Sequence, residues 1–131
     1  MIPAARLHDD RGSAVVDFTL TSVLLLFVFL GVFQLGLTLH VRNTLISCAS
    51  EGARYGAREG STPQEGAGRA RDLIGRSLSG RFAQDVTARV DRTDAGVEVV
   101  VVDVTAPLPV VGPFGPGEQL EVTGRAFEES Q

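Results

Sequence analysis

Lysine and tryptophan are absent from this sequence of 131 residues, and cysteine occurs once, at Cys48. Without lysine, the chain lacks the residue that a Walker-type phosphate loop requires. A single cysteine cannot form an internal disulfide, so we expect Cys48 to be a small packing residue, with an intermolecular disulfide as the alternative. All 12 basic residues are arginine, the formal net charge is −4, and no arginine cluster is dense enough to indicate a nucleic-acid partner.

Clusters of catalytic or metal-ligating side chains are also missing from the sequence. The two histidines, His8 and His40, flank an apolar run and share no neighbourhood with acids or cysteine. Ser77 and Ser79 fall in a predicted helix rather than on the strand-to-helix elbow of a nucleophilic serine. The glycines of segment 112–117 are interrupted by proline and lack the setting of a nucleotide-binding loop. We therefore expect neither an enzyme nor a bound cofactor or metal.

The most prominent feature present is an uncharged apolar run, Phe18–Leu39. Its length matches the about 20 residues that a helix needs to cross a hydrocarbon layer of about 30 Å. A secretory signal would have a shorter apolar core and a small-residue cleavage site, whereas His40 and Arg42 follow this run. The run therefore indicates a retained transmembrane helix. Arg6 and Arg11 ahead of it give a weak positive-inside bias, which predicts a cytoplasmic N-terminus and an extracytoplasmic chain from about residue 42.

The helical pattern continues beyond the run as far as Gly60, a predicted helix stop. Small residues recur at a spacing of four in this stretch, and they are Ala49, Ala53 and Ala57, with Gly52 and Gly56 beside them. Small residues let another backbone approach closely. The partner is either another element of the same chain or a neighbouring subunit, and the sequence leaves both open.

The rest of the chain, residues 61–131, has the pattern of a small α+β domain. Thr62 and Glu65 form a capping box with Pro63 at the first helical position, which predicts a second helix from Pro63 to Arg81. Alternating apolar residues then predict three strands, at residues 86–91, 97–105 and 120–127. The expected fold class is an α+β membrane protein with a helix from Ser13 to Glu59, a shorter second helix and a small three-stranded antiparallel sheet.

The sequence resembles the TadE-like family, the pilin-like proteins of tight-adherence (Flp-type) pilus systems. Three stretches carry the resemblance around the apolar helix, namely RGSAVVDF at residues 11–18, VRNT at 41–44 and ASEGARYGA at 49–57. The similarity extends over about residues 11–60, which is less than half of the chain. It implies a pilin-like architecture in which a single N-terminal helix anchors an extracytoplasmic domain.

The resemblance also implies a processing site and a role for one acid. In this family a prepilin peptidase cuts after the glycine on the cytoplasmic side, which corresponds to cleavage between Gly12 and Ser13. The family usually has glutamate five residues after the cut, where this sequence has Asp17. Its carboxylate is expected to pair with the new amino group of Ser13, within the chain or between subunits. The alternative is that Asp17 only caps the helix N-terminus.

These interpretations divide the chain into a leader peptide at 1–12, a transmembrane helix at 13–41, its extracytoplasmic continuation at 42–60 and a small domain at 61–131. The resemblance implies a TadE-like minor pilin or pseudopilin of a bacterial cytoplasmic membrane. Its implied partners are the prepilin peptidase, other pilin-like and pilus-assembly subunits, and the lipid bilayer. Two alternatives remain: a bitopic membrane-anchored binding protein with no processing, and a secreted enzyme whose signal has been misread.

Overall fold

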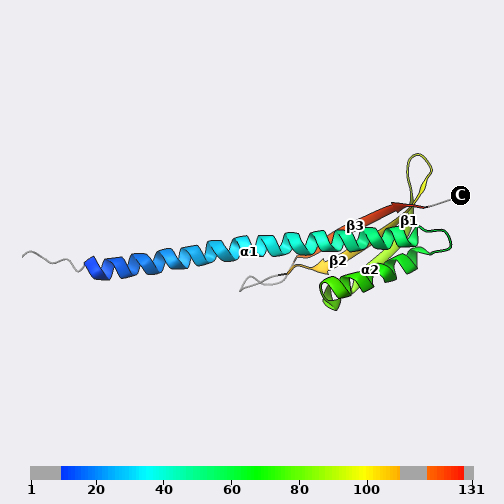
Figure 1. The fold of residues 1–131 in the computed structure, drawn as a ribbon. Coiled ribbons are helices and arrows are strands. Elements are labelled where there is room, and N and C mark those ends of the chain that lie inside the picture. The colour runs from blue at the N-terminus through cyan, green and yellow to red at the C-terminus, as the bar shows by residue number, and fades with distance from the viewer. Residues whose placement is uncertain (1–9, 110–117, 129–131) are drawn as a thin grey trace, which may run out of the picture.

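The structure is a computed structural model that describes residues 10–109 and 118–128. Most of the predicted leader and the glycine-rich segment 112–117 lie outside the described residues. The elements in chain order are α1 (Asp10–Gly56), α2 (Pro63–Ser77), the 3₁₀-helix η1 (Gly80–Phe82), β1 (Asp85–Arg92), β2 (Glu98–Pro107) and β3 (Gln119–Phe127). Figure 1 shows α1 as a long rod, with all other elements gathered beside its C-terminal half. The predicted fold class of one long apolar helix, a shorter helix and a three-stranded antiparallel sheet is confirmed.

The long helix α1 contains 47 residues and no proline, which corresponds to about 70 Å of continuous helix. It ends at Gly56, before the predicted end at Glu59. The early end coincides with a close tertiary contact: a Cβ on Gly56 would lie 3.1 Å from the Thr62 carbonyl oxygen, so the start of α2 packs against the last residue of α1. Gly60 has a φ of 79° and lies in the connecting turn rather than at the helix cap.

The second helix begins as predicted and ends early. The Thr62 hydroxyl accepts from the Glu65 backbone N–H at 3.2 Å, and the Glu65 carboxylate accepts from the Thr62 N–H at 2.7 Å, so the capping box is confirmed. The predicted end at Arg81 is wrong because Leu78 leaves the helical conformation after Ser77, as the chain turns toward β1. Phe82 is still buried, but it is held by η1 rather than by a continued helical stripe.

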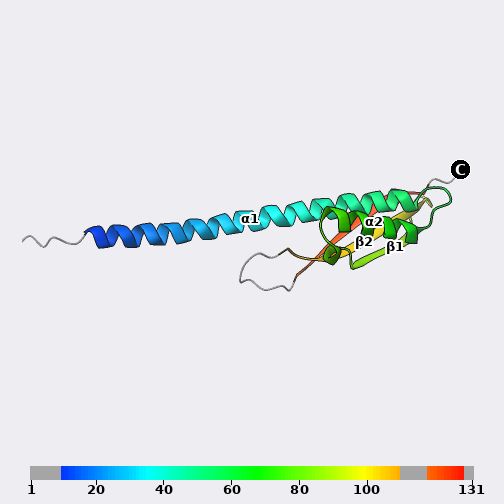
Figure 2. The ribbon, with the colours of Figure 1, turned by 60° about the horizontal axis from the view of Figure 1, so that its bottom comes forward.

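The sheet has the order β1-β2-β3, with both neighbouring pairs antiparallel. Strand β1 extends the predicted range by one residue at each end and β3 by one at its start, whereas β2 begins one residue later and ends two residues later than predicted. Both helices cover the same face of the sheet, α1 along β3 and α2 along β1 (Figure 2). The core lies between the helices and this face, and its members include Leu45, Ala49, Ala70, Ile74, Val86, Val102, Val104 and Val122. The opposite face of the sheet is not covered by any described element.

Candidate functional site

The N-terminal half of α1 is bare. We call residues 11–33 the shaft, and every residue of 11–29 in it is exposed. Its exposed side chains are mostly Leu, Val and Phe, and no residue of its most apolar 18-residue window is buried. Among the described residues this is the one helix long and apolar enough to cross a membrane, by length and composition. An apolar surface of this size is typical of contact with lipid or with other helices.

The predicted processing residues lie at the exposed start of the shaft. Gly12 and Ser13 are in the first turns of α1, and a Cβ added to Gly12 would meet nothing within 4 Å. Asp17 follows Ser13 by four residues, which places it about 6 Å further along the axis on the same side of the helix. Its exposed carboxylate makes no hydrogen bond or ion pair with any described residue. It is therefore open to a cationic group from outside the described residues.

The small residues of α1 lie instead in its covered half, where they pack against other parts of the chain. A Cβ added to Gly52 would lie 2.6 Å from the Gly66 carbonyl oxygen and 2.7 Å from the Ala70 Cβ, so α2 approaches the backbone of α1 here. A Cβ on Gly124 of β3 would collide with the backbone of Ala49. Two elements of the same chain thus occupy positions that the sequence left open to a neighbouring subunit.

The remaining small residues of this stretch are also enclosed. Ala53, Gly56 and Ala57 are all buried in the folded chain. Cys48 beside them is only 6% exposed. Burial raises the pKa of its thiol, and a hydrogen bond with Ser77 lowers it to a smaller extent. A buried thiol with a raised pKa is a poor nucleophile, which favours the packing role expected for Cys48 over an intermolecular disulfide.

The domain meets the shaft at a junction that sequence reasoning missed. The Gln34 side-chain amide donates to the Pro109 carbonyl oxygen, 75 residues away in the chain, and to the Thr38 hydroxyl at 3.5 Å. Leu37 packs on the edge of the core, and Leu108 is half-buried next to Pro109. We call Gln34, Leu37, Thr38, Leu108 and Pro109 the base of the domain. The one available signal was a lone amide within an otherwise apolar run.

The uncovered face of the sheet carries a second candidate surface. Val101 points to this face and is nevertheless fully buried, because its cross-strand neighbours Arg89 and Arg125 cover it with their aliphatic stems. Arg89 forms an ion pair with Asp103, which also accepts from the Thr123 hydroxyl at 2.7 Å. A shallow hollow of about 230 Å³ lies beside them, lined by Asp91, Arg92, Thr93, Val99, Val101, Arg125, Ala126 and Phe127. The valines on both faces of β2 were the sequence signal for this surface.

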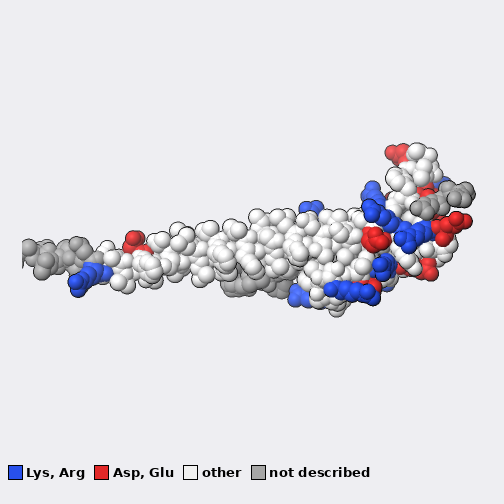
Figure 3. Space-filling model, viewed as in Figure 1, with Lys and Arg blue, Asp and Glu red and all other residues white. Residues whose placement is uncertain are grey.

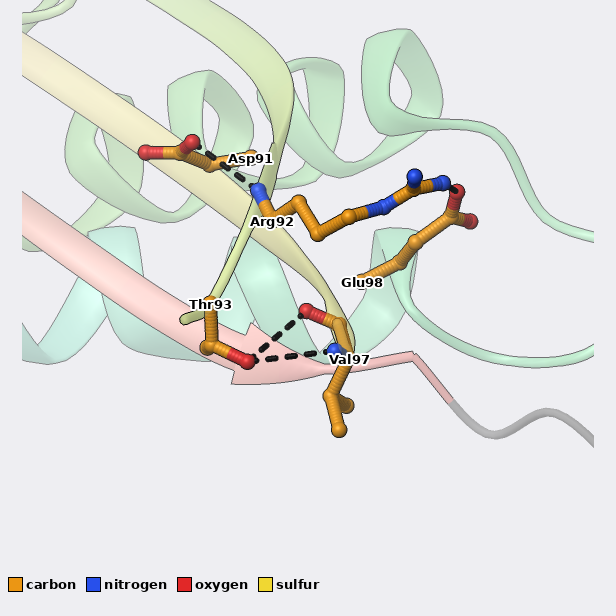
Figure 4. Close-up of polar contacts among 5 residues, drawn as sticks. All are labelled: Asp91, Arg92, Thr93, Val97 and Glu98. Carbon is orange, nitrogen blue, oxygen red and sulfur yellow. Dashed lines mark hydrogen bonds and ion pairs between the residues drawn. The ribbon is translucent and has the colours of Figure 1, made fainter. Parts of the chain in front are cut away.

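Polar contacts hold the hairpin at the far end of the domain (Figure 4). The Thr93 hydroxyl accepts from the Val97 N–H at 3.1 Å, and Arg92 pairs with Glu98 at 2.9 Å. The hydrogen bond from Arg92 is the main reason that the pKa of Glu98 is lowered, and a hydrogen bond with Glu128 lowers it further. The same hydrogen bond between the two carboxyl groups raises the pKa of Glu128. No group of three His, Cys, Asp or Glu in the described residues could hold a metal ion.

Charge is distributed unevenly along the molecule. On the face shown in Figure 3, charged side chains gather at the far end of the domain, and the middle of α1 is uncharged. The sequence between Asp17 and Arg42 contains no acidic residue and no arginine. The geometry thus defines a class of protein in which a helical shaft, uncharged between Asp17 and Arg42, carries a small α+β domain with most of the charge.

The family match found for this chain lies entirely within α1. Residues 12–54 match the family model described as TadE-like protein. The match begins at Gly12, ends within α1 and covers about a third of the chain, somewhat less than the 11–60 expected from the sequence. It confirms the TadE-like resemblance for the shaft and most of the covered half of α1. Searches of curated proteins and of solved structures gave no match.

Proposed function

We propose that this protein is a TadE-like minor pilin or pseudopilin that takes part in assembly of a tight-adherence pilus. The single observation that carries the proposal is the TadE-like match, which begins at Gly12 and includes the exposed apolar shaft from that residue onward. Pilus proteins of this kind are structural components, and no catalytic constellation in the described residues argues for an enzyme. The partners are other pilus subunits, which would contact the shaft, and the lipid bilayer in which the shaft resides before assembly.

In this proposal the chain is a prepilin processed between Gly12 and Ser13. The N-terminus lies in the cytoplasm, the shaft crosses the cytoplasmic membrane once and the domain lies outside. Cleavage frees the amino group of Ser13 one helical turn from Asp17. Two opposite charges at the border of the hydrocarbon offset part of each other's desolvation cost, which favours pairing of Asp17 with a processed N-terminus.

The mass of the mature protein tests the proposed processing. Protein extracted from membranes of cells with an active prepilin peptidase should begin at Ser13. Gly12→Leu should abolish the cut, whereas Gly31→Leu, at another exposed glycine of the same helix, should leave it unchanged. An intact N-terminus on the mature protein in such cells would refute processing.

Asp17 variants test its proposed assembly role. Asp17→Asn retains much of the capping ability of the side chain but loses the charge. It should leave cleavage largely intact and reduce co-purification with other pilus subunits, and Asp17→Glu should be tolerated. Normal assembly with Asp17→Asn would reduce this acid to a marker of the membrane border.

One observation favours a second candidate, a bitopic membrane-anchored binding protein that is not processed. The hollow on the uncovered sheet face is lined by apolar residues, among them the exposed Phe127, and by polar ones that include Arg125. Such a surface can bind an extracytoplasmic partner without any pilus. The two candidates differ in the N-terminus of the mature protein, since only the pilin-like function requires the cut at Gly12.

A further inference from the structure

The domain begins on α1 before the apolar run ends. The run extends to Leu39, but Gln34, Leu37 and Thr38 are already half-buried against the folded domain. Val41 is fully part of the core. If the whole run lay in hydrocarbon, the base of the domain would be drawn into it. The position of the domain on the helix therefore restricts how deeply the helix can sit in a bilayer.

The polar groups at the base are paired within the chain. The Gln34 amide donates to the Pro109 carbonyl oxygen, and the Thr38 hydroxyl donates to the Gln34 carbonyl oxygen at 2.9 Å. The Leu108 N–H donates to the Glu118 carbonyl oxygen at 3.3 Å, and the flanking residues Pro107 and Pro109 have no N–H to satisfy. Pairing of this kind is what a surface of low polarity requires, because water is scarce there and unpaired polar groups are costly.

One charge limits how far the base can descend. Glu118 is exposed and lies directly opposite Leu108 across the start of the β2–β3 connection. A carboxylate at this position needs water or headgroups around it. The base can therefore enter the headgroup layer, whereas Glu118 keeps it out of the hydrocarbon.

We propose that the base of the domain rests in the headgroup layer of the outer leaflet, and that the hydrocarbon layer covers about residues 15–34 of α1. This proposal rests on the membrane insertion contained in the proposed function. Twenty residues at 1.5 Å each span the about 30 Å of hydrocarbon and, counted back from Gln34, reach Val15. Asp17 then lies about 3 Å inside the cytoplasmic edge of the hydrocarbon, and Arg11 lies about 6 Å outside it among the headgroups.

This register gives the lone acid of the shaft a defined position. An acid inside the hydrocarbon edge has little water available, so a cationic partner there has a stronger effect than it would have in water. If the hydrocarbon instead covered the whole run from Phe18 to Leu39, Asp17 would lie outside it. The two registers differ by about three residues at the cytoplasmic border and about five at the outer border, and the outer difference is large enough to measure.

Cysteine labelling with a membrane-impermeant maleimide applied from the outer side measures the outer border. The full-length protein is used in a Cys48→Ala background, with single cysteines at the exposed positions Phe29, Leu39 and Asn43. Leu39→Cys should label within about tenfold of the rate of Asn43→Cys, and Phe29→Cys at least about a hundredfold more slowly, since a thiol in hydrocarbon is shielded from the reagent. Equally slow labelling at Leu39 and Phe29 would overturn the register. Rapid labelling at Phe29 would instead show that the helix is not inserted, which is a failure of the proposed function.

Quenching by lipids with a spin-labelled headgroup tests whether the base touches the membrane. A fluorophore on Gln119→Cys, at the start of β3, is compared with one on Arg125→Cys, which lies on the same face of the same strand about 20 Å away. Strong quenching at Gln119 and little at Arg125 is expected. Weak quenching at both positions, in a protein whose Phe29→Cys variant is protected from the maleimide, would refute contact between the base and the headgroups while leaving insertion intact.

Discussion

The two halves of α1 form one unbroken helix but differ in how they use small side chains. The shaft presents large apolar residues such as Leu24 and Phe27 to its surroundings, and all of residues 11–29 are exposed. The covered half has small residues such as Ala49 and Gly52 where α2 and β3 approach its backbone. Side-chain size, rather than helix propensity, therefore distinguishes the half that faces outward from the half on which α2 and β3 pack. Large side chains suit contact with lipid or other helices, and small ones permit close packing within the chain.

The largest expected difference between the halves comes from truncating a leucine in each. Leu45 is fully buried in the core, whereas Leu24 is exposed on the shaft. Leu45→Ala should lower the free energy of unfolding of the domain by about 2–5 kcal/mol through lost burial and a cavity. Leu24→Ala should change it by less than about 0.5 kcal/mol. Denaturant unfolding of the full chain in detergent micelles, followed by circular dichroism, measures both. Equal losses would mean that the shaft contributes to the domain core.

The next largest expected effect is that alanine has opposite effects on the free energy of unfolding at two glycines of α1. Gly52→Ala introduces a methyl group 2.6 Å from the Gly66 carbonyl oxygen, so the helices must separate, at a cost of about 1–3 kcal/mol. Gly31 has nothing within 4 Å of an added Cβ, and alanine there should favour the helix by up to about 1 kcal/mol. Thermal unfolding of the two variants in the same micelles should move in opposite directions. A stabilising Gly52→Ala would contradict the close helix contact.

Much of this architecture can be predicted because its signals are local. The uncharged run, the capping box at Thr62 and the alternation in the strands each depend on residues within a few positions, and each led to the correct element. The misses depend on distant contacts. Helix α1 ends at Gly56, where Thr62 and Pro63 come close, and the base depends on Gln34 meeting Pro109 across 75 residues. No periodicity within α1 contains that information.

The candidate site shows the same division. Gly12, Ser13 and Asp17 were identified from their order along the chain, and their roles in processing and assembly stay predictions. The hollow beside Val101 was not predicted, since a valine run identifies a central strand but does not tell which side chains from β1 and β3 will cover its outer face.

A smaller effect is expected at the start of α2. Thr62→Ala removes the hydroxyl that accepts from the Glu65 N–H, and it should lower the free energy of unfolding by about 1 kcal/mol. Thr62→Ser keeps the oxygen and is the matched control. Hydrogen exchange at the first amides of α2 should rise in the alanine variant and remain unchanged in the serine variant. Unchanged exchange in both variants would show that the cap contributes nothing measurable.

The smallest effect on stability, but a clear chemical one, is expected at Cys48. Burial raises the pKa of this thiol above its ordinary value of 9.0. Because the pKa of the thiol is raised in the folded protein, the protonated thiol contributes its full stabilisation at pH values below the pKa of the unfolded chain. That contribution is lost as the pH rises through the pKa of the folded protein. At pH 8 the folded protein should therefore react with iodoacetamide much more slowly than the unfolded chain, and it should form no disulfide-linked dimer in air. Rapid alkylation at pH 8 would contradict the burial of Cys48.

The division of α1 into a membrane part and a domain part is tested most directly by the mass of the fragment that the membrane protects from protease. Spheroplasts are treated from outside with a protease of broad specificity, and the fragment that remains in the membrane is weighed. The account predicts a fragment that begins at Ser13 and ends between residues 35 and 45, so that a single measurement reads the processing site and the outer border of the membrane together. A fragment that retains the domain, or the absence of any protected fragment, would contradict it.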